Sequence, residues 1–263
     1  MIRPYLEFIK KSFRNNTVYK VDYFAGIINT IIIIFVNINI WKAIYNGGDV
    51  IEGKQFKTIA TYLVLGFLMQ CVFMMDEYLI ESKVKSGLIS SDLLKPISFR
   101  FYIFSCNIGT LVFRLVMQLI PALIISVLIF GLQPPFSAAM GVCFAISVIL
   151  GYLVLYLLNF IVWISSFWFY YTFSLITIKD AAIMIFSGAL VPLWFMPEGL
   201  REIIRFTPFE SIYFIPISIY LGQTPKNEII VSIVTQLIWI AILFGIGHVL
   251  WKAANKKLVV QGG

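Results

Sequence analysis

The sequence predicts an all-α membrane protein that crosses the bilayer several times, and three observations support this class. Hydrophobic residues make up 60% of the 263 residues and charged residues only 13%, whereas soluble domains average about half apolar and a quarter charged. The apolar residues gather in runs as long as the helices of roughly 20 residues that a bilayer requires. The segments between most of these runs are short, and they carry most of the Lys and Arg residues.

The first element, residues 1–20, is expected to be an interfacial amphipathic helix. Leu6, Ile9 and Phe13 fall on one helical face, whereas basic residues such as Lys10 fall on the other. Such a helix lies in the headgroup plane with its basic face toward anionic lipid. A solvated start to the first span is the alternative. Charges run throughout this stretch, so no cleaved signal peptide is expected.

Six apolar spans follow, at residues 22–44, 59–79, 103–130, 138–164, 172–194 and 227–250. The remaining loops are too short for a separate folded domain, so residues 1–263 are predicted to form a single transmembrane domain. An even number of crossings returns the C-terminus to the side of the N-terminus. Lys and Arg then concentrate on that side, which predicts that both termini are cytoplasmic. Four spans with re-entrant hairpins would have the same parity.

A short polar and basic segment, residues 81–100, separates the second and third spans. Val84 and Leu88 lie four residues apart and would share a helical face. Gly87 permits a bend at the start of this helix, and Pro96 disfavours its continuation. The sequence predicts a helix of about two turns on the cytoplasmic side, although an ordinary basic turn fits the composition equally well.

The outer segment between the last two spans, residues 187–225, is strongly apolar but interrupted by proline. Frequent prolines exclude one continuous helix. Broken helices at membrane depth require a covering of protein or a water-filled cavity, so short re-entrant or interfacial helices are expected, with a plain extracellular loop as the alternative. The prolines are Pro192, Pro197, Pro208, Pro216 and Pro225.

Charges in or beside the spans are candidate functional groups. Arg114 lies inside the third apolar run, and Asp76 and Glu77 end the second. Pairing of Arg114 with one of these carboxylates would neutralise a costly buried charge, and snorkelling to the inner interface is the alternative. A structural role and a role in the translocation pathway both remain open.

Nothing in the sequence predicts catalysis. A Walker-type G-x-x-x-x-G-K-[ST] loop is missing, so any nucleotide must be bound by a partner. His248 is the only histidine, and a lone histidine is more often a headgroup-region residue than a metal ligand. The three cysteines are expected to be small apolar residues of the spans. No cofactor, metal or nucleic acid is expected on this chain.

Four motifs resemble one family, the ABC-2 type permeases, and in particular a subfamily that includes viologen and drug exporters of bacteria. The resemblance extends from the N-terminal amphipathic helix to the last residue. The motifs are V-K-S-G-L-I-S-S-D-L-L-K-P-I at Val84–Ile97, S-G-A-L-V-P-L-W-F-M-P at Ser187–Pro197, T-P-F at Thr207–Phe209 and L-V-V-Q-G-G at Leu258–Gly263.

The resemblance implies the fold of a type V (ABC-2) exporter transmembrane domain and a division of labour. Two copies of a separate ATPase subunit would bind ATP and Mg²⁺, and this chain would pair with a second, identical or related permease in the cytoplasmic membrane. The loop between spans two and three would form a coupling helix that docks on the ATPase, and Asp92 would make a polar contact there or remain solvated. The coupling candidates are Gly87, Leu88, Leu93, Leu94, Lys95 and Pro96.

The resemblance further implies that the outer hairpin caps the pathway, with Gly188, Pro192, Pro197 and Pro208 as gate candidates. Multidrug or peptide efflux is the expected activity, and the cargo would be hydrophobic, amphipathic or peptide-like. An ion-coupled secondary transporter would instead show carboxylates in mid-span and repeated halves, which the sequence lacks. A non-transporting membrane scaffold or sensor is the third alternative.

Overall fold

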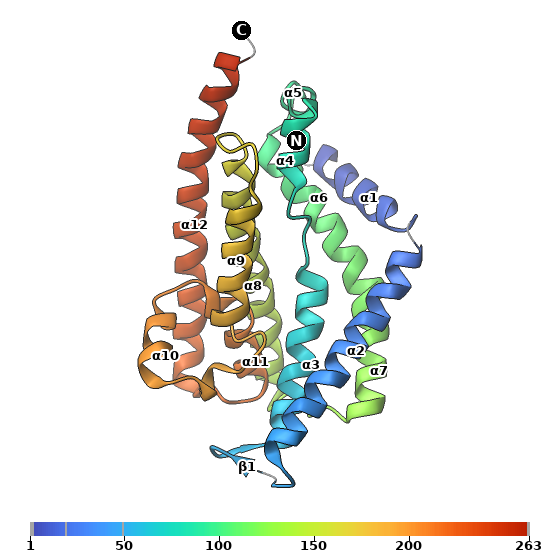
Figure 1. Cartoon of the computed structure of the whole chain (residues 1–263), viewed down its shortest axis with the longest axis vertical. Coiled ribbons are helices and arrows are strands. Elements are labelled where there is room, and N and C mark those ends of the chain that lie inside the picture. Colours follow the sequence, from blue (N-terminus) through green and yellow to red (C-terminus); the bar gives the residue numbers. More distant parts are fainter. Residues whose placement is uncertain (1–2, 19, 49, 262–263) are drawn as a thin grey trace. The chain divides into compact units, whose positions relative to one another are not determined.

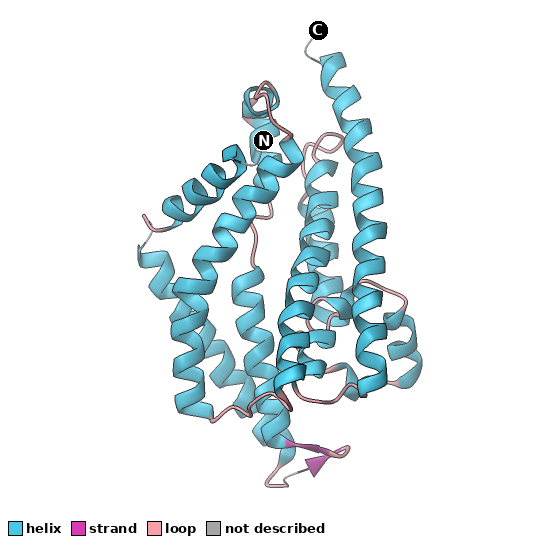
Figure 2. Ribbon diagram, turned by 180° about the vertical axis from the view of Figure 1, so that it is seen from behind, coloured by secondary structure: helices cyan, strands magenta, loops and turns pink. Residues whose placement is uncertain are grey.

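The computed structural model describes residues 3–18, 20–48 and 50–261, and for residues 20–22 and 258–261 it describes only the backbone. Residues 1, 2 and 19 of the predicted interfacial segment, and residues 262 and 263 of the terminal motif, therefore lie outside the described residues. Helices make up most of the described chain (Figure 2). The chain divides into two compact units, Met1–Met75 with Ser90–Gln133 and Asp76–Ile89 with Pro134–Gly263, which we call unit 1 and unit 2.

Five helices of the described chain are long and apolar enough to cross a membrane (Figure 1). They agree with five of the six predicted spans to within several residues at most ends. These helices are Tyr23–Tyr45, Phe56–Phe73, Phe99–Phe130, Ala138–Ser165 and Lys226–Lys257. An all-α, multi-pass membrane protein is therefore confirmed as the fold class.

Unit 1 is built around α3 (Phe56–Phe73), which is apolar on all sides and almost completely buried, as expected of a helix enclosed by others. A two-residue turn at Glu52 and Gly53, both with positive φ, closes a small hairpin that the sequence did not predict. The other elements of the unit are α1 (Arg3–Asn16), α2 (Lys20–Tyr45), β1 (Val50–Ile51), β2 (Lys54–Gln55), α6 (Phe99–Arg114), the π-helical turn η1 (Leu115–Leu119) and α7 (Ile120–Phe130).

The predicted amphipathic helix forms as α1, and its aromatic face packs along α6. Phe8 meets Tyr102 edge to face, with ring centroids 4.7 Å apart, and Tyr5–Phe101 and Phe13–Phe113 repeat this contact. Gly109 permits the close approach, because a Cβ there would lie 2.4 Å from the Ile9 carbonyl oxygen. Helix α1 is therefore fixed to unit 1, and its location in the headgroup plane stays a prediction.

Unit 2 is organised by α8 (Ala138–Ser165) and α12 (Lys226–Gln261), which pack along each other. The buried Gln236 amide joins three elements: it accepts a hydrogen bond from the Ser147 hydroxyl and donates to the carbonyl oxygens of Ser147 and Ser211. The other elements are α4 (Leu79–Lys85), α9 (Phe173–Phe186), η2 (Leu193–Phe195), α10 (Glu198–Arg205), η3 (Phe209–Ser211) and α11 (Phe214–Tyr220).

The predicted span at residues 172–194 is not one continuous helix. Helix α9 stops after 14 residues at Phe186, because Gly188 adopts the left-handed conformation, φ +77°, that terminates helices. Helix α11 begins where α9 ends: the Phe214 N–H donates to the Ser187 carbonyl oxygen at 3.1 Å. The two helices, of 14 and 7 residues, together provide about 31 Å of helix.

Residues 188–213 form an excursion between these two helices, broken as the prolines predicted. Its inner end is packed against the middle of α8, since a Cβ on Gly151 would come within 2.7 Å of the Ile212 carbonyl oxygen. Gly151 lies about 20 Å along α8 from Ala138 at 1.5 Å per residue. Within unit 2, α10 and α11 lie toward the end at which α12 begins (Figure 1).

Candidate functional site

The segment at residues 81–100 folds as two short helices rather than one. Helix α4 ends at Lys85, Gly87 turns the chain with φ +74°, and α5 (Leu88–Leu93) follows. Pro96 lies in the turn before α6. The helix predicted between Gly87 and Pro96 thus exists, with six residues. The boundary between the two units falls inside α5, after Ile89.

The surface of α5 and of the turn after it exposes apolar side chains. Leu88 is 58% exposed and Leu94 is 85% exposed, whereas Ile89 is buried. Among the other coupling candidates, Gly87 and Pro96 are exposed, and Leu93 and Lys95 are half-buried. Leu88 and Leu94 are therefore accessible to a partner.

Asp92 is not solvated, contrary to one of the two roles expected for it. Its side chain is buried, and the Lys95 ammonium lies 2.6 Å from its carboxylate. The same ammonium lies 4.6 Å from the centre of the Tyr102 ring on α6. Lys95 is therefore held within unit 1, with its charge paired to Asp92.

Unit 1 makes a further contact to this segment. The Ser98 N–H, at the start of α6, donates to the Tyr5 hydroxyl oxygen at 3.1 Å. Lys95 also lies within 5.9 Å of the Phe8 ring centre. The end of the segment at residues 81–100 is thus fastened to the amphipathic helix α1.

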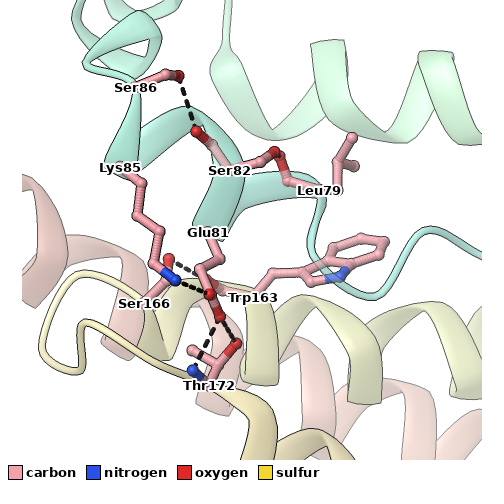
Figure 3. Close-up of polar contacts among 8 residues, drawn as sticks. All are labelled: Leu79, Glu81, Ser82, Lys85, Ser86, Trp163, Ser166 and Thr172. Atoms are coloured by element: carbon pink, nitrogen blue, oxygen red, sulfur yellow. Dashed lines mark hydrogen bonds and ion pairs between the residues drawn. The ribbon is translucent and has the colours of Figure 1, made fainter.

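In unit 2, Glu81 fastens the beginning of the segment to the start of α9. Its buried carboxylate accepts hydrogen bonds from the Thr172 N–H, at 2.8 Å, and from the Thr172 hydroxyl (Figure 3). Lys85, one turn further along α4, forms an ion pair with Glu81 and lies 3.9 Å from the Tyr171 ring centre. Burial raises the pKa of Glu81, but the hydrogen bonds from Lys85 and Thr172 outweigh it, so the pKa lies below its usual 4.5.

A second buried charge, Lys179, lies on α9. Its ammonium contacts the carboxylate of Glu77 and the amide oxygen of Asn159, and it lies 3.0 Å from Asp180. Asp76 is exposed and accepts a hydrogen bond from the Tyr78 N–H at 3.0 Å. Sequence reasoning singled out Glu77 but not Lys179, although a lysine inside a predicted span was a visible signal.

Arg114 lies at the last residue of α6, beside the end of α3. Its guanidinium donates to the Cys71 carbonyl oxygen at 3.1 Å. Cys71 is in the last turn of α3, where carbonyl groups lack helical partners and where positive charge is favoured by the helix dipole. Arg114 thus supports the end of α3, and the carboxylate pairing expected for it stays a prediction.

The gate candidates occupy the excursion between α9 and α11. Gly188 and Pro192 are buried, Pro208 is half-buried and Pro197 is exposed at the start of α10. These residues therefore shape a partly buried turn rather than a loose loop. Their role as a gate stays a prediction.

Long apolar helices with charged groups buried among them define a multi-pass membrane protein. Residues 31–262 match the family described as ABC-2 family transporter protein, and the chain belongs to this family. It is the membrane component, or permease, of an ABC transporter, and its family associates with an ABC ATPase. A search of curated proteins found no match.

Proposed function

We propose that this chain is the permease subunit of an ATP-driven exporter that moves a hydrophobic, amphipathic or peptide-like molecule out of the cytoplasmic membrane. One observation carries the proposal. A short helix, α5, exposes Leu88 beside the exposed Leu94, and the polypeptide on either side is fastened to α9 and to α1. This is the arrangement that a transmitting element between a motor subunit and a membrane domain needs.

The motor is a pair of ABC ATPase subunits, which bind ATP and Mg²⁺, and the working complex contains two permease chains, identical or related. Closure of the ATPases on ATP displaces the segment at residues 81–100. In unit 2 the Glu81–Thr172 contact passes this displacement to the start of α9. In unit 1 the Ser98–Tyr5 contact passes it to α1. Such rigid-body transmission switches between discrete packings.

The proposed topology has six crossings, with α9 and α11 sharing one of them. Their combined length of about 31 Å matches the hydrocarbon thickness of about 30 Å. Both termini then lie in the cytoplasm, as the Lys and Arg distribution favours. The excursion at residues 188–213 becomes an outer re-entrant hairpin, in which Gly188, Pro192, Pro197 and Pro208 act as the gate.

Two alternatives from the sequence are less well supported. An ion-coupled transporter or a membrane scaffold would have no use for an ATPase partner, whereas membership in the ABC-2 family favours one. Loss of transport on removal of ATP, with the ion gradients held constant, distinguishes the ATP-driven mechanism from both.

The test is retention of the ATPase subunit by the tagged permease. We expect Leu88→Asp combined with Leu93→Asp to reduce retention at least tenfold, because a carboxylate in an apolar docking groove is desolvated without a partner. Leu94→Asp, at a more exposed position, tests the same surface with less risk to folding. Val50→Asp, an exposed apolar residue of β1, is the matched control and should retain the ATPase. Undiminished retention by both α5-region variants, each eluting as folded protein, would contradict the docking assignment.

A further inference from the structure

A pocket with a volume of about 510 Å³ lies within unit 1, between α2, the end of α3 and the junction of α6 with η1. Helix α2 supplies one wall, because Tyr23, Gly26, Asn29 and Ile33 recur at the spacing of three to four residues that places side chains on one helical face. The lining residues that the structure describes all belong to unit 1. One permease chain therefore forms this part of the pocket by itself.

Three hydrogen-bond donors on the pocket wall are unused. Within the residues that the structure describes, the amide N–H groups of Asn29 and Gln118 and the hydroxyl of Tyr23 donate to no protein group. None of these side chains is buried, since Asn29 is exposed and the other two are half-buried. The three donors are therefore accessible to a molecule in the pocket.

The other polar side chains of the pocket are engaged within the chain. Asn16, Thr30 and Gln70 each donate to the carbonyl oxygen four residues before them. Arg114 donates to the Cys71 carbonyl oxygen and makes a further interaction. A ligand is therefore met chiefly by the three unused donors rather than by the guanidinium.

Two of the unused donors lie at the depth of the hydrocarbon core. Asn29 is about 9 Å along its helix from Tyr23, where the first long apolar span begins. Gln118 is about 18 Å along its span from the end at Phe130. An amide N–H without an acceptor is costly in such surroundings, so a molecule that supplies acceptors there would relieve this cost.

The backbone around Gln118 is adapted to the pocket. Gln118 lies in the π-helical turn η1, and single π-helical turns inside α-helices occur frequently at functional sites. Its amide lies against α2, where a Cβ on Gly26 would come within 2.9 Å of the Gln118 Nε2 atom. The missing side chain at Gly26 thus leaves room for this donor.

The chemistry of the pocket favours a ligand with uncharged acceptor groups. All three unused groups can donate, and a carbonyl oxygen accepts two such bonds. The described lining residues include no carboxylate, so a cation would be desolvated there without a counter-charge. Phe67, Phe113 and Ile33 add apolar surface to the same pocket, which suits a hydrocarbon chain.

We infer that this pocket binds the carbonyl groups, amide or ester, of an uncharged amphiphile. Asn29, Gln118 and Tyr23 donate hydrogen bonds to the carbonyl oxygens, and the apolar wall holds the first part of the hydrocarbon chain. The carbonyl group comes either from a membrane lipid or from the transported cargo. The cargo assignment rests on the proposed function, whereas binding does not.

The test is saturation binding of radiolabelled N-dodecanoylglycinamide, an uncharged amphiphile with two amide carbonyl groups. The purified permease is placed in nanodiscs of ether-linked phosphatidylcholine, which lacks ester carbonyl groups, and binding to empty nanodiscs is subtracted. We expect saturable binding that the unlabelled compound displaces. Dodecyltrimethylammonium, which has a chain of the same length and no acceptor, should not displace it. Absence of saturable binding, or equal displacement by both compounds, would overturn the inference.

Dodecyl phosphate distinguishes carbonyl recognition from attraction by charge. We expect it to displace the probe no better than the unlabelled amide does, because the donors of the pocket are neutral and Arg114 is engaged elsewhere. Displacement at a tenfold lower concentration would show that charge governs the pocket, and would overturn the assignment to carbonyl groups.

Variants of α2 locate the site. Asn29→Leu should raise the half-saturating concentration at least fivefold, because the ligand oxygen is left buried without a donor. Tyr23→Phe, which removes only a hydroxyl, should raise it at least threefold and keeps the inference testable if Asn29→Leu does not fold. The matched control is Asn39→Leu on the same helix, where the amide already donates to the Phe35 carbonyl oxygen at 2.7 Å. Wild-type binding by Tyr23→Phe and Asn29→Leu, or an equal loss in Asn39→Leu, would overturn the assignment.

Two further arms distinguish the sources of the carbonyl group. If a membrane lipid occupies the pocket, the half-saturating concentration of the probe rises when ester-linked phosphatidylcholine replaces the ether-linked form. If cargo occupies it, this concentration is unchanged, and the probe increases ATP hydrolysis by the complex with the ATPase at least twofold. Neither effect would overturn both sources. Failure to associate with any ATPase would contradict the proposed function and leave the binding result intact.

Discussion

At the scale of residues, Glu81 is the side chain that most directly ties the loop between spans two and three to the rest of unit 2. Its carboxylate is buried, and all of its hydrogen bonds in Figure 3 come from Lys85 and Thr172. A buried carboxylate is costly unless such donors surround it. If one hydrogen-bonding partner is removed, the other stays buried without a hydrogen bond, and its full desolvation cost lowers the stability of the fold.

The ionised form of Glu81 should make folding stability depend on pH. Its pKa is lower in the folded protein than its usual 4.5, so its contribution is complete above about pH 4.5 and is lost as pH falls through the folded-state value. We expect Glu81→Gln to lower the free energy of unfolding by about 1–2 kcal/mol at neutral pH. The difference should shrink as the pH falls below 4.5, and thermal unfolding between pH 7 and pH 3.5 measures it.

The matched control for this comparison is Glu7→Gln, at an exposed carboxylate that pairs with Lys10 on the surface of α1. Exposed ion pairs contribute little to folding stability, so the stability of Glu7→Gln should follow that of the wild type between pH 7 and pH 3.5. A constant deficit of Glu81→Gln at all pH values would show that the ionised carboxylate is not the stabilising species.

At the scale of elements, the interruption between α9 and α11 is the main departure from a regular bundle. The apolar run continues past Phe186, but Gly188 turns the chain and α11 takes over the direction of the span (Figure 1). Discontinuous helices of this kind place free backbone groups inside a membrane protein, which is tolerated only where protein covers them. The buried Ser187, Gly188 and Ala189 meet this condition.

Substitution of Gly188 should therefore destabilise the protein more than substitution of an ordinary helical glycine. Gly188→Ala forces a side chain into a left-handed conformation, at a cost of about 1–2 kcal/mol. Gly199→Ala on α10 is the control, since a Cβ there meets nothing within 4 Å, and helix propensity favours alanine. We expect the unfolding temperature to fall for the first variant and not for the second. Equal effects would contradict a specific role for the turn.

At the scale of the whole molecule, the number of crossings determines on which side each loop lies. Five long helices alone would place the termini on opposite sides, whereas the proposed composite of α9 and α11 would restore an even number. The distribution of basic residues favours the even number. The loop before α9 should then be cytoplasmic, together with α4 and α5.

Cysteine labelling of intact cells should distinguish these topologies. The three native cysteines, Cys71, Cys106 and Cys143, are first replaced by alanine or serine. We expect single cysteines at Ser86 and Lys256 to react with a membrane-impermeant maleimide only after lysis, and single cysteines at Val50 and Glu198 to react in intact cells. Labelling of Lys256→Cys in intact cells would exclude the six-crossing topology.

The sequence was sufficient to predict the fold class and five of the spans, because an apolar run of about 20 residues is the main signal of a membrane-spanning helix. The end of α9 was not predictable in the same way, since the chain stays apolar through Trp194 and Phe195 and only Gly188 interrupts it. The contact between Glu81 and Thr172 joins residues far apart in sequence, so no local pattern signals it. Likewise, the pocket beside Arg114 depends on the packing of α2, α3 and α6.

The joint between α9 and α11 also limits how far a displacement at the cytoplasmic side can travel. A continuous helix transmits a push along its whole length, whereas two separate helices meet at this joint, where the Phe214 N–H donates to the Ser187 carbonyl oxygen. Helix α11 packs against α8, and Ile212, just before α11, lies against Gly151. In the proposed six-crossing topology, the inner part of this span would therefore pivot while its outer part keeps its place, so that opening on one side of the membrane need not loosen the seal on the other.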